Sequence, residues 1–405
     1  MSPALRCYRC GERYEDAARV RCGCGEPLWF ETDAAAFTWA DRRDADGMWR
    51  YEPLLPIDRP DGIARAAGGT PLVRSERLDA AAGCRVHVKD EGEHPTGAYK
   101  DRGSAVAVPH AIATSGGAVG TVSYGNMAMS TAAHAASLGR ECVVLVPDEI
   151  PTVRLALIGQ YDPTIVRVDG DYGALYGDAL RLSGELPISL LVSDAPARIS
   201  GYKTALFEIC EAFAPEAPDA LVLPTSSGGF ASGLWRGIRD LEAAGLLDDP
   251  PRLYLVQTVA GDPITRAFDA GETDPTPLSP DETGETIAHS IGNPDPPSGG
   301  RALAAVRDTG GAVLSVDDDE IRRAQRRFAV DGGFCVEPAS AASLAGATRL
   351  SERGELAPDD DVVLLPTGTG FKELGTGDAP VATERTSRTA LPERLASLLD
   401  APRQR

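Results

Sequence analysis

Short apolar runs alternate with longer amphipathic stretches along most of the chain. The apolar runs predict strands at 85–89, 119–123, 141–147, 164–168, 188–193, 220–224, 252–257 and 361–366. The stretches with helical spacing predict helices at 126–138, 171–183, 200–213, 230–245, 318–330 and 338–353. Strands that are apolar on both faces and alternate with helices indicate parallel sheets covered on both sides.

The predicted strands are spread over most of the chain, which fits two doubly wound parallel-sheet domains better than one. We therefore expect an α/β fold of this kind with a small N-terminal segment. Residues 271–300 are dense in proline, glycine and aspartate and predict a long loop, a kind of segment that is often functional. After residue 375 the sequence is polar apart from a short amphipathic stretch at 391–399.

Composition narrows the compartment and the partners. The 405 residues are 42% hydrophobic, and no stretch approaches the roughly 20 apolar residues of a membrane-spanning helix. The start of the chain lacks the apolar segment of a secretory signal, so we expect a cytoplasmic protein without a membrane partner. A net charge of −20 argues against nucleic acid as a partner. Dispersed acids and scarce lysines are typical of a salt-adapted, halophilic protein.

Four cysteines lie in the first 25 residues in the pattern C-x2-C-x11-C-x-C: Cys7, Cys10, Cys22 and Cys24. Two close pairs separated by a short spacer are typical of a zinc knuckle, in which four thiolates hold the ion. Such a zinc ion is structural, because four thiolates leave no position for a substrate. Reduced, metal-free cysteines are the alternative, and a disulfide is disfavoured in a reducing cytoplasm.

Lysine is scarce, with four lysines against 36 arginines. Arginine can replace lysine at most surface positions, but it cannot form a Schiff base. The four lysines each lie beside a strand end or a glycine motif: Lys89, Lys100, Lys203 and Lys372. Retention by chance is the alternative. The segment HPTGAYKDRG, residues 94–103, therefore predicts that Lys100 occupies a site that needs a primary amine.

Two glycine-containing segments each follow a predicted strand and begin a predicted helix. In TSSGGF, residues 225–230, the N–H groups of the helix start are suited to binding phosphate. In SYGN, residues 123–126, the helix start can hold a carboxylate, and the Asn126 amide can hydrogen-bond a ring hydroxyl. The alternatives are an ordinary glycine-rich turn for the first and an N-cap asparagine for the second.

In their order along the chain, these motifs resemble the fold type II pyridoxal-phosphate enzymes (tryptophan synthase beta-like), and among them the threonine synthases. The matching segments between residues 68 and 372 are KDEGEHPTGAYKDRG (89–103), SYGN (123–126), PARISGYKT (196–204), SSGG (226–229), ETIAHSIGNP (285–294), FCVEPASAAS (334–343) and LLPTGTGFK (364–372). With this resemblance, the expected parts are a zinc-knuckle-like segment, a large cofactor-binding domain in two pieces, a small domain and a polar tail, at 1–30, 31–105 plus 204–380, 106–203 and 381–405.

The resemblance implies pyridoxal 5'-phosphate as the cofactor and Lys100 as the residue that forms an imine with it and acts as acid and base. It also implies that Asn126 hydrogen-bonds the pyridoxal 3-hydroxyl and that Thr367 faces the pyridine nitrogen. The cofactor phosphate would lie on the loop of Ser226, Ser227, Gly228 and Gly229. A neutral hydroxyl partner leaves the ring nitrogen unprotonated, which suits eliminations and replacements better than transamination.

The family's substrate is O-phospho-L-homoserine, which reacts with water to give L-threonine and phosphate. The resemblance thus implies a lyase of threonine biosynthesis, with a phosphorylated amino acid as its small-molecule partner. The leaving phosphate needs a cationic, hydrogen-bonding environment. The implied substrate contacts are Ser193 and Arg198 for the phosphate, Lys89 and Thr96 as weaker candidates, and Ser123 and Tyr124 in the loop that would hold the carboxylate.

Several positions depart from the family pattern. Val192 and Ala195 stand where the family usually has asparagine, and Tyr124 replaces a small hydroxyl residue. Ser226 replaces a glycine of the phosphate loop. An altered substrate is therefore the alternative prediction: a serine/threonine dehydratase, or a β-replacement enzyme acting on an O-phosphoserine-like amino acid.

A hypothesis from another class is a catalytically idle regulator on this scaffold, with the cysteine segment as a docking module. A colourless protein that borohydride does not label at Lys100 would support it. A zinc-ribbon nucleic-acid binder is disfavoured by the charge of −20. A homodimer is compatible with the resemblance, and the sequence leaves the oligomeric state open.

Overall fold

The computed structural model describes residues 3–150, 152–170, 172–373 and 385–400. Met1–Leu374 form one compact unit, and Gly375–Arg405 form a second unit that contains the helix α13 (Leu391–Asp400). The other α-helices described are α1 (Glu76–Ala82), α2 (Lys100–Ser115), α3 (Asn126–Ser137), α4 (Thr152–Gly159), α5 (Tyr172–Glu185), α6 (Pro196–Tyr202), α7 (Thr204–Phe213), α8 (Gly229–Ala243), α9 (Pro263–Asp269), α10 (Gly299–Asp308), α11 (Asp318–Arg327) and α12 (Pro338–Glu352). None of the described helices is long and apolar enough to cross a bilayer.

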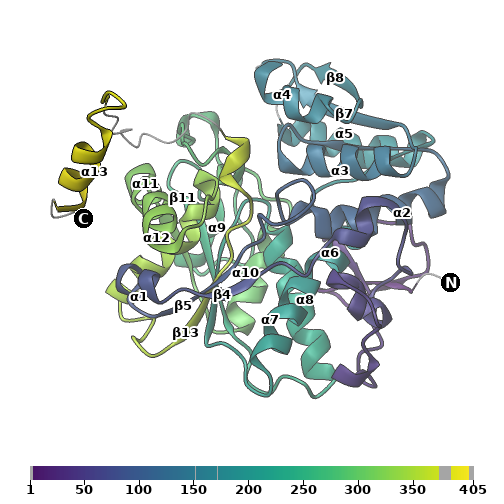
Figure 1. Ribbon diagram of the computed structural model, residues 1–405. Helices are drawn as coiled ribbons and strands as arrows, with labels where there is room; N and C mark the ends of the chain where they lie inside the picture. The colour runs from purple at the N-terminus through teal and green to yellow at the C-terminus, as the bar shows by residue number, and fades with distance from the viewer. Residues whose placement is uncertain (1–2, 151, 171, 374–384, 401–405) are drawn as a thin grey trace. The chain divides into compact units, whose positions relative to one another are not determined.

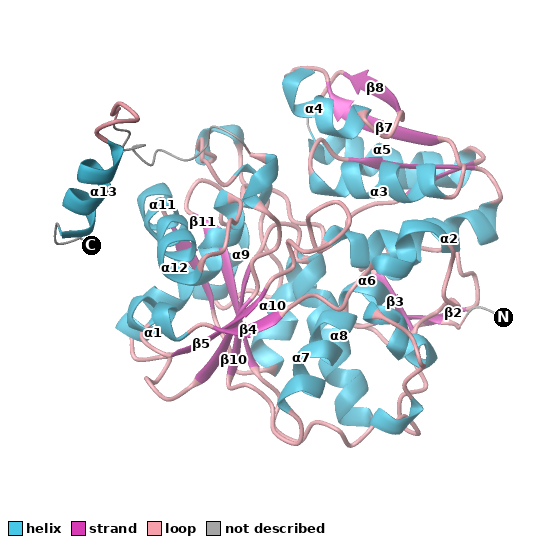
Figure 2. Cartoon of the chain, in the orientation of Figure 1, coloured by secondary structure: helices cyan, strands magenta, loops and turns pink. Residues whose placement is uncertain are grey.

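A six-stranded sheet forms the centre of the first unit (Figure 2). Its order is β12-β11-β10-β13-β5-β4, with bounds Val313–Val316, Arg252–Thr258, Ala220–Pro224, Asp361–Leu364, Arg85–Lys89 and Leu72–Arg74. All neighbours are parallel except β4, which pairs antiparallel with β5 at the edge.

The two faces of this sheet carry separate cores, as the period of two along a buried strand requires. In β10, Leu221 and Leu223 pack with residues of α7, α8 and α10, whereas Val222 packs with residues of α1, α11 and α12. Figure 1 shows α11 and α12 on one side of the strands and α7 and α8 on the other. The prediction of parallel sheets covered on both faces is confirmed.

A second sheet has the order β8-β7-β6-β9 and is parallel throughout. Its strands are Thr164–Val168, Cys142–Pro147, Ala118–Val122 and Ile188–Leu190. Residues of α2, α3 and α4 form a core with Val144 and Val146, and residues of α5 form another with Val122 and Leu190. The division of the chain at residues 105 and 203 stays a prediction, although this sheet lies between those positions.

The N-terminal residues form a small antiparallel sheet in the order β2-β1-β3, with bounds Arg13–Tyr14, Leu5–Cys7 and Leu28–Phe30. We call residues 5–30 the N-terminal ribbon. Its Trp29 ring lies 5.3 Å from the Trp235 ring of α8, and Tyr8 contacts both rings edge-on. The ribbon therefore shares a core with the large sheet's helices.

Two predicted helices differ from the structure. The helix expected at 200–213 is two helices, because α6 ends at Tyr202 and α7 begins at Thr204. The helix expected at 318–330 continues from α11 as a π-helical turn, Phe328–Gly332. Residues 271–300 are the expected loop, with short 3-10 turns at Pro280–Glu282 and His289–Ile291.

Candidate active site

A tight turn presents Lys100 as the first residue of α2. Gly97 has a φ of 74°, and a Cβ there would lie 2.7 Å from the Thr369 Cγ2 atom, so glycine suits this position. The Asp101 carboxylate accepts hydrogen bonds from the Thr96 N–H at 2.7 Å and from the Thr96 hydroxyl at 2.8 Å. These contacts fix the direction in which α2 begins, and with it the position of Lys100.

The same turn is joined to the segment after β13. The Tyr99 N–H donates to the Thr367 carbonyl at 3.0 Å, and the Thr369 N–H donates to the Gly97 carbonyl at 3.0 Å. Ala98 and Gly368 form an isolated antiparallel bridge. Lys100 and Thr367, which are 267 positions apart in the sequence, are thereby held in adjacent segments.

The Lys100 amine is in an apolar and aromatic environment. Its Nζ atom lies 2.5 Å from the Tyr99 hydroxyl and 4.3 Å from the centre of the Tyr99 ring. The pKa of Lys100 is lowered from 10.5 to about 7, by burial first and then by the Arg198 charge, while Glu337 opposes the change. A substantial part of this amine is therefore neutral near pH 7, as both a nucleophile and a general base require.

Asn126, the first residue of α3, connects the part of the chain around the second sheet to Glu337 and Lys372. Its Nδ2 atom donates to the two Glu337 carboxylate oxygens at 3.0 and 3.3 Å, and its Oδ1 atom accepts from the Lys372 Nζ atom at 2.7 Å. Lys372 also donates to the Gly97 carbonyl at 2.8 Å. Burial lowers the pKa of Lys372. Two lysine amines and one carboxylate thus share this region.

Thr367 lies buried just after β13. Its hydroxyl is 3.1 Å from the Ser340 hydroxyl, which also accepts from the Gly368 N–H at 2.8 Å. Ser340 belongs to α12, whose first residue is Pro338, a good first residue because it has no N–H to satisfy. The Thr367 hydroxyl thus has a neutral hydroxyl as its neighbour, and the Glu337 carboxylate lies 3.5 Å from that same Ser340 hydroxyl.

The segment Thr225–Gly229 is a strand-to-helix turn at the carboxyl end of β10. Gly228 caps α8 with a φ of 81°, and a Cβ there would lie 2.5 Å from the Ser298 carbonyl oxygen. Ser298 also donates its N–H to the Ser227 carbonyl at 2.9 Å. A helix start of this kind suits an anion, and the assignment of this turn to a phosphate stays a prediction.

Ser193 lies beside this turn in the segment after β9, and Arg198 follows it in α6. The Ser193 carbonyl oxygen lies 3.1 Å from the position of a Cβ on Gly229. The Ser193 hydroxyl is buried and has no hydrogen-bond partner among the described residues. Arg198, fully buried in α6, donates to the Ser104 hydroxyl at 2.9 Å and to the Thr131 hydroxyl at 2.8 Å.

A family model described as "Pyridoxal-phosphate dependent enzyme" matches residues 63–368, more than half of the chain. The chain belongs to this family. It is a pyridoxal-phosphate-dependent enzyme, a lyase, which confirms the resemblance drawn from the motifs.

Relatives and solved structures agree with this assignment. The threonine synthase of Methanocaldococcus jannaschii is 34% identical over 377 residues, covering 91% of this chain and 92% of that protein. The threonine synthase of Mycobacterium leprae is 36% identical over 329 residues, covering 80% and 88%. Maize serine racemase has a TM-score of 0.61 at 22% identity, covering 82% of this chain and 92% of that chain, and shows the fold alone.

The residues described above fit the family's cofactor. The amine of Lys100 has a lowered pKa, Asn126 and Thr367 lie in adjoining segments, and Gly228 makes a turn whose N–H groups suit a phosphate. The buried Ser193 hydroxyl has no hydrogen-bond partner among the described residues, so Ser193, which lies beside this turn, can offer one further hydrogen bond. Pyridoxal phosphate is the cofactor implied by the family, and the assignment of individual residues to it remains a prediction.

Two of the four lysines have other partners. Lys89 donates to the Glu208 carboxylate at 2.6 Å and to the Thr70 carbonyl at 2.5 Å, and its predicted substrate contact stays a prediction. Lys203 donates to the Asp240 carboxylate at 2.7 Å. Burial lowers the pKa of Lys203 to about 8. Burial and scarcity alone therefore do not identify a reacting lysine.

The remaining predicted substrate residues lie in the turn before α3 and in the turn before α2. Ser123 accepts a hydrogen bond from the Gly125 N–H at 3.2 Å, and Tyr124 packs half-buried against the α2–α3 core. Thr96 is committed to Asp101, as described above. Their contacts with a substrate stay predictions.

No role was predicted from the sequence for Glu337, Asp194 or Ser298, which the structure places among these residues. Glu337 stands immediately before the proline that begins α12, and the structure shows it buried. The signal available in the sequence was an acid directly before such a helix start. Asp194 follows the predicted Ser193, and Ser298 ends the loop expected at 271–300. The signal at this last position was the long loop itself.

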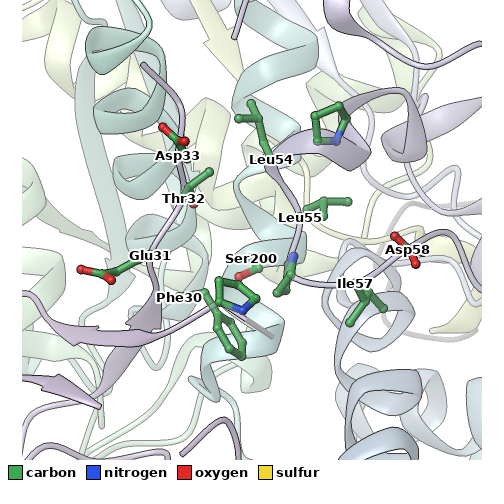
Figure 3. A pocket seen from close by; sticks show the side chains of 12 residues that line it. Phe30, Glu31, Thr32, Asp33, Leu54, Leu55, Ile57, Asp58 and Ser200 are labelled. Carbon is green, nitrogen blue, oxygen red and sulfur yellow. The ribbon is translucent and has the colours of Figure 1, made fainter. Parts of the chain in front are cut away.

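A cavity of about 300 Å³ lies elsewhere, between the segment after β3 and the turn at residues 53–58 (Figure 3). Its lining includes Phe30, Glu31, Asp33, Leu55, Ile57, Asp58 and Ser200. None of the predicted cofactor or substrate residues lines it. The carboxylates on its wall are unsuited to an anionic cofactor or substrate.

The four N-terminal cysteines come together in the ribbon. The sulfur atoms of Cys7, Cys10, Cys22 and Cys24 all lie within 4.8 Å of one another. The Cys7–Cys24 distance is 3.7 Å and the Cys10–Cys22 distance is 3.4 Å. These four sulfur atoms could hold a metal ion, and its identity as zinc stays a prediction.

Proposed function

We propose that this enzyme converts O-phospho-L-homoserine and water to L-threonine and phosphate. The observation that carries the proposal is the buried, unpartnered hydroxyl of Ser193, a residue whose backbone carbonyl lies beside the glycine turn and whose segment leads to the buried Arg198. A neutral hydroxyl and a guanidinium suit a second phosphate, the one that leaves the substrate. The relatives named threonine synthase, 31–36% identical over most of the chain, support the same activity.

Bound pyridoxal phosphate supplies an electron sink that stabilises negative charge on an attached amino acid. Lys100 Nζ is the proposed group that removes protons from the substrate carbons and returns them, because its pKa near 7 allows both protonation states. Asn126 orients the ring through its side-chain amide, and Thr367 offers a neutral hydroxyl to the ring nitrogen. The turn Ser226–Gly229 holds the cofactor phosphate with its N–H groups.

The test is a substrate comparison on the purified holoenzyme. Phosphate and threonine release from O-phospho-L-homoserine is expected, with little ammonia release from serine or threonine. Ser193→Ala is expected to raise KM for the phosphorylated substrate about ten-fold, since it removes a hydrogen bond to a charged group. The matched control is Ser189→Ala on β9, whose hydroxyl contacts Ser115 and not the turn. Ammonia release without phosphate release would refute the proposal.

One observation favours a second candidate, a serine/threonine dehydratase or a β-replacement enzyme on an O-phosphoserine-like substrate. Val192 and Ala195 are buried in the apolar core with α5, so neither position offers an amide to the substrate. A substrate with a shorter side chain needs fewer such contacts. The comparison above separates the candidates, because this second one gives ammonia from serine or turnover of O-phosphoserine.

We also propose a structural zinc ion held by Cys7, Cys10, Cys22 and Cys24. The support is the convergence of four sulfur atoms to distances that suit tetrahedral coordination. The expected result is one zinc per chain by elemental analysis of protein purified without added metal. Loss of zinc in the variant Cys10→Ser, together with a lower melting temperature, would support the site. A metal-free wild-type protein with four titratable thiols would refute it.

A further inference from the structure

The N-terminal ribbon reaches the segment beside the glycine turn through one arginine. Arg21, next to the metal-ligand candidate Cys22, donates to the Asp194 carboxylate at 2.9 Å and to the Tyr176 hydroxyl at 2.5 Å. The Asp194 side chain is fully buried, and that of Arg21 is 20% exposed. An ion pair with so little exposure is costly to form and costly to break on one side, so it constrains both segments.

Asp194 connects this ion pair to the glycine turn through Ser298. Its Oδ2 atom also accepts from the Ser298 hydroxyl at 3.0 Å. Ser298 in turn contacts the turn directly: its N–H donates to the Ser227 carbonyl, and its own carbonyl occupies the space beside Gly228. Asp194 is also the immediate neighbour of Ser193, so one carboxylate fixes both sides of the proposed phosphate region.

A second connection runs from the ribbon to Ser298. The buried Arg301 donates to the Leu28 carbonyl of β3 at 3.2 Å and to the Ser298 hydroxyl at 3.1 Å. The ribbon is therefore linked to Ser298 in two ways. Arg21 of the ribbon is linked to it through Asp194, and Arg301 of α10 contacts both the ribbon and Ser298. Arg21 forms an isolated antiparallel bridge with Pro27 and directly precedes Cys22, so a metal ion held by the four cysteines would help to fix the backbone that carries Arg21.

We propose that Arg21 is a positioning residue for cofactor binding, and that it depends on the metal in the ribbon. With metal bound, Arg21 holds Asp194, and Asp194 holds Ser298 against the turn Ser227–Gly229. The inference rests on the proposed assignment of that turn to the cofactor phosphate and on the proposed zinc ion. It concerns cofactor affinity and is independent of which amino acid is the substrate.

The experiment measures cofactor affinity in the full-length protein. Cofactor is removed and returned by titration, and binding is followed by absorbance and by the ³¹P resonance of the bound phosphate. Arg21→Met is expected to weaken cofactor binding about ten-fold and to shift the ³¹P resonance, with an unchanged metal content. Arg21→Lys is expected to restore part of the affinity. The matched control Arg9→Met removes a ribbon arginine whose partners are Glu26 and the exposed Asp274, and leaves binding unchanged.

Metal dependence is tested by the same titration on Cys10→Ser and on Cys10→Ser combined with Arg21→Met. The cysteine variant is expected to weaken cofactor binding to the same extent as Arg21→Met, and the combination to weaken it no further. Equal affinity and an unchanged ³¹P resonance in Arg21→Met would overturn the inference, as would independent effects of the two changes. If the cysteine variant fails to fold, the Arg21 series still decides the positioning role.

These results are separable from a failure of the proposed function. A wild-type protein that binds no pyridoxal phosphate would contradict the cofactor assignment. A wild-type protein that binds it, and releases ammonia instead of phosphate, would refute the proposed substrate and leave the role of Arg21 intact.

Discussion

Helix α2 carries two cations near its start, the half-buried Lys100 and the fully buried Arg102, whose electrostatic environments differ. Arg102 donates to the Glu91 carboxylate and to the Glu208 carboxylate at 2.7 Å each, and Lys89 adds a second cation to the same cluster. The two positive and two negative charges balance. Two residues earlier, Lys100 has the Tyr99 hydroxyl as its hydrogen-bond acceptor, with no carboxylate in an ion pair with it among the described residues.

The comparison shows that charged partners can outweigh burial in setting the pKa of a buried group. Burial by itself raises the pKa of Glu208, but Arg102 and Lys89 lower it to about 2. At Lys100 burial acts with the Arg198 charge, and the pKa falls to about 7. The balanced cluster around Arg102 stays charged and stabilises the fold, while Lys100 can change its protonation state near neutral pH.

The largest effect is expected from replacing Lys100, whose amine is in no ion pair with a carboxylate among the described residues. Lys100→Arg keeps a cation but cannot form an imine, so we expect activity to fall by about 1,000-fold or more. After borohydride reduction, no cofactor should remain attached to the chain. Lys203→Arg is the control, because its cation pairs with Asp240 and should not carry cofactor. Cofactor retained on Lys100→Arg would mean that another lysine reacts.

The next effect comes from breaking the balanced cluster. Glu208→Gln leaves Arg102 and Lys89 with one carboxylate between them, and we expect a loss of about 3–5 kcal/mol in the free energy of unfolding. Denaturant titration measures it. Glu185→Gln, which removes a carboxylate paired with Arg181 on the surface, should cost less than about 1 kcal/mol. Equal costs would show that the cluster is no more stabilising than a surface pair.

Acid should weaken the cluster in a defined window. The pKa of Glu208 in the folded protein lies below its ordinary value of 4.5, so its contribution is present above pH 4.5 and is lost as pH falls toward about 2. The contribution amounts to about 3 kcal/mol. The difference in unfolding free energy between the wild type and Glu208→Gln should therefore shrink across this window. A difference that does not change with pH would contradict the assignment.

The smallest effect concerns the pH at which Lys100 becomes reactive. Arg198→Met removes a charge that lowers the pKa of Lys100, so the midpoint for cofactor loading should move to higher pH, by about 0.5–1 unit. Stopped-flow absorbance of the cofactor-free protein across pH 5–10 measures the midpoint. Arg181→Met, on an exposed helix face, should leave it unchanged. A shift to lower pH would reverse the proposed electrostatics.

Much of the fold could be predicted because its strands are buried on both faces. ALVLP, residues 220–224, is such a strand, and β10 has the predicted bounds. Helix α2 was not predicted as an element, because it contains Pro109 and is buried on nearly every side, which removes the polar stripe. Strand β12 was missed because four residues, one of them serine, give too short a pattern.

The candidate site could be predicted where one short motif carries its chemistry, as for Lys100 and Asn126. It could not be predicted where function depends on pairs that are distant in sequence. Arg21 and Asp194 are 173 positions apart, and nothing in either local segment indicates the other. Glu337 was likewise visible only as part of a motif, until the structure placed its carboxylate against the Asn126 amide.

The packing of the N-terminal ribbon has a consequence for synthesis of the chain. Leu28 accepts its hydrogen bond from Arg301, which follows it by 273 residues. At 5–20 residues per second, a ribosome needs roughly 15–50 s to add that stretch. During this time helices that pack against Trp29 are still being synthesised, whereas the ribbon cysteines have already left the ribosome. Metal loading can therefore precede completion of the sheet.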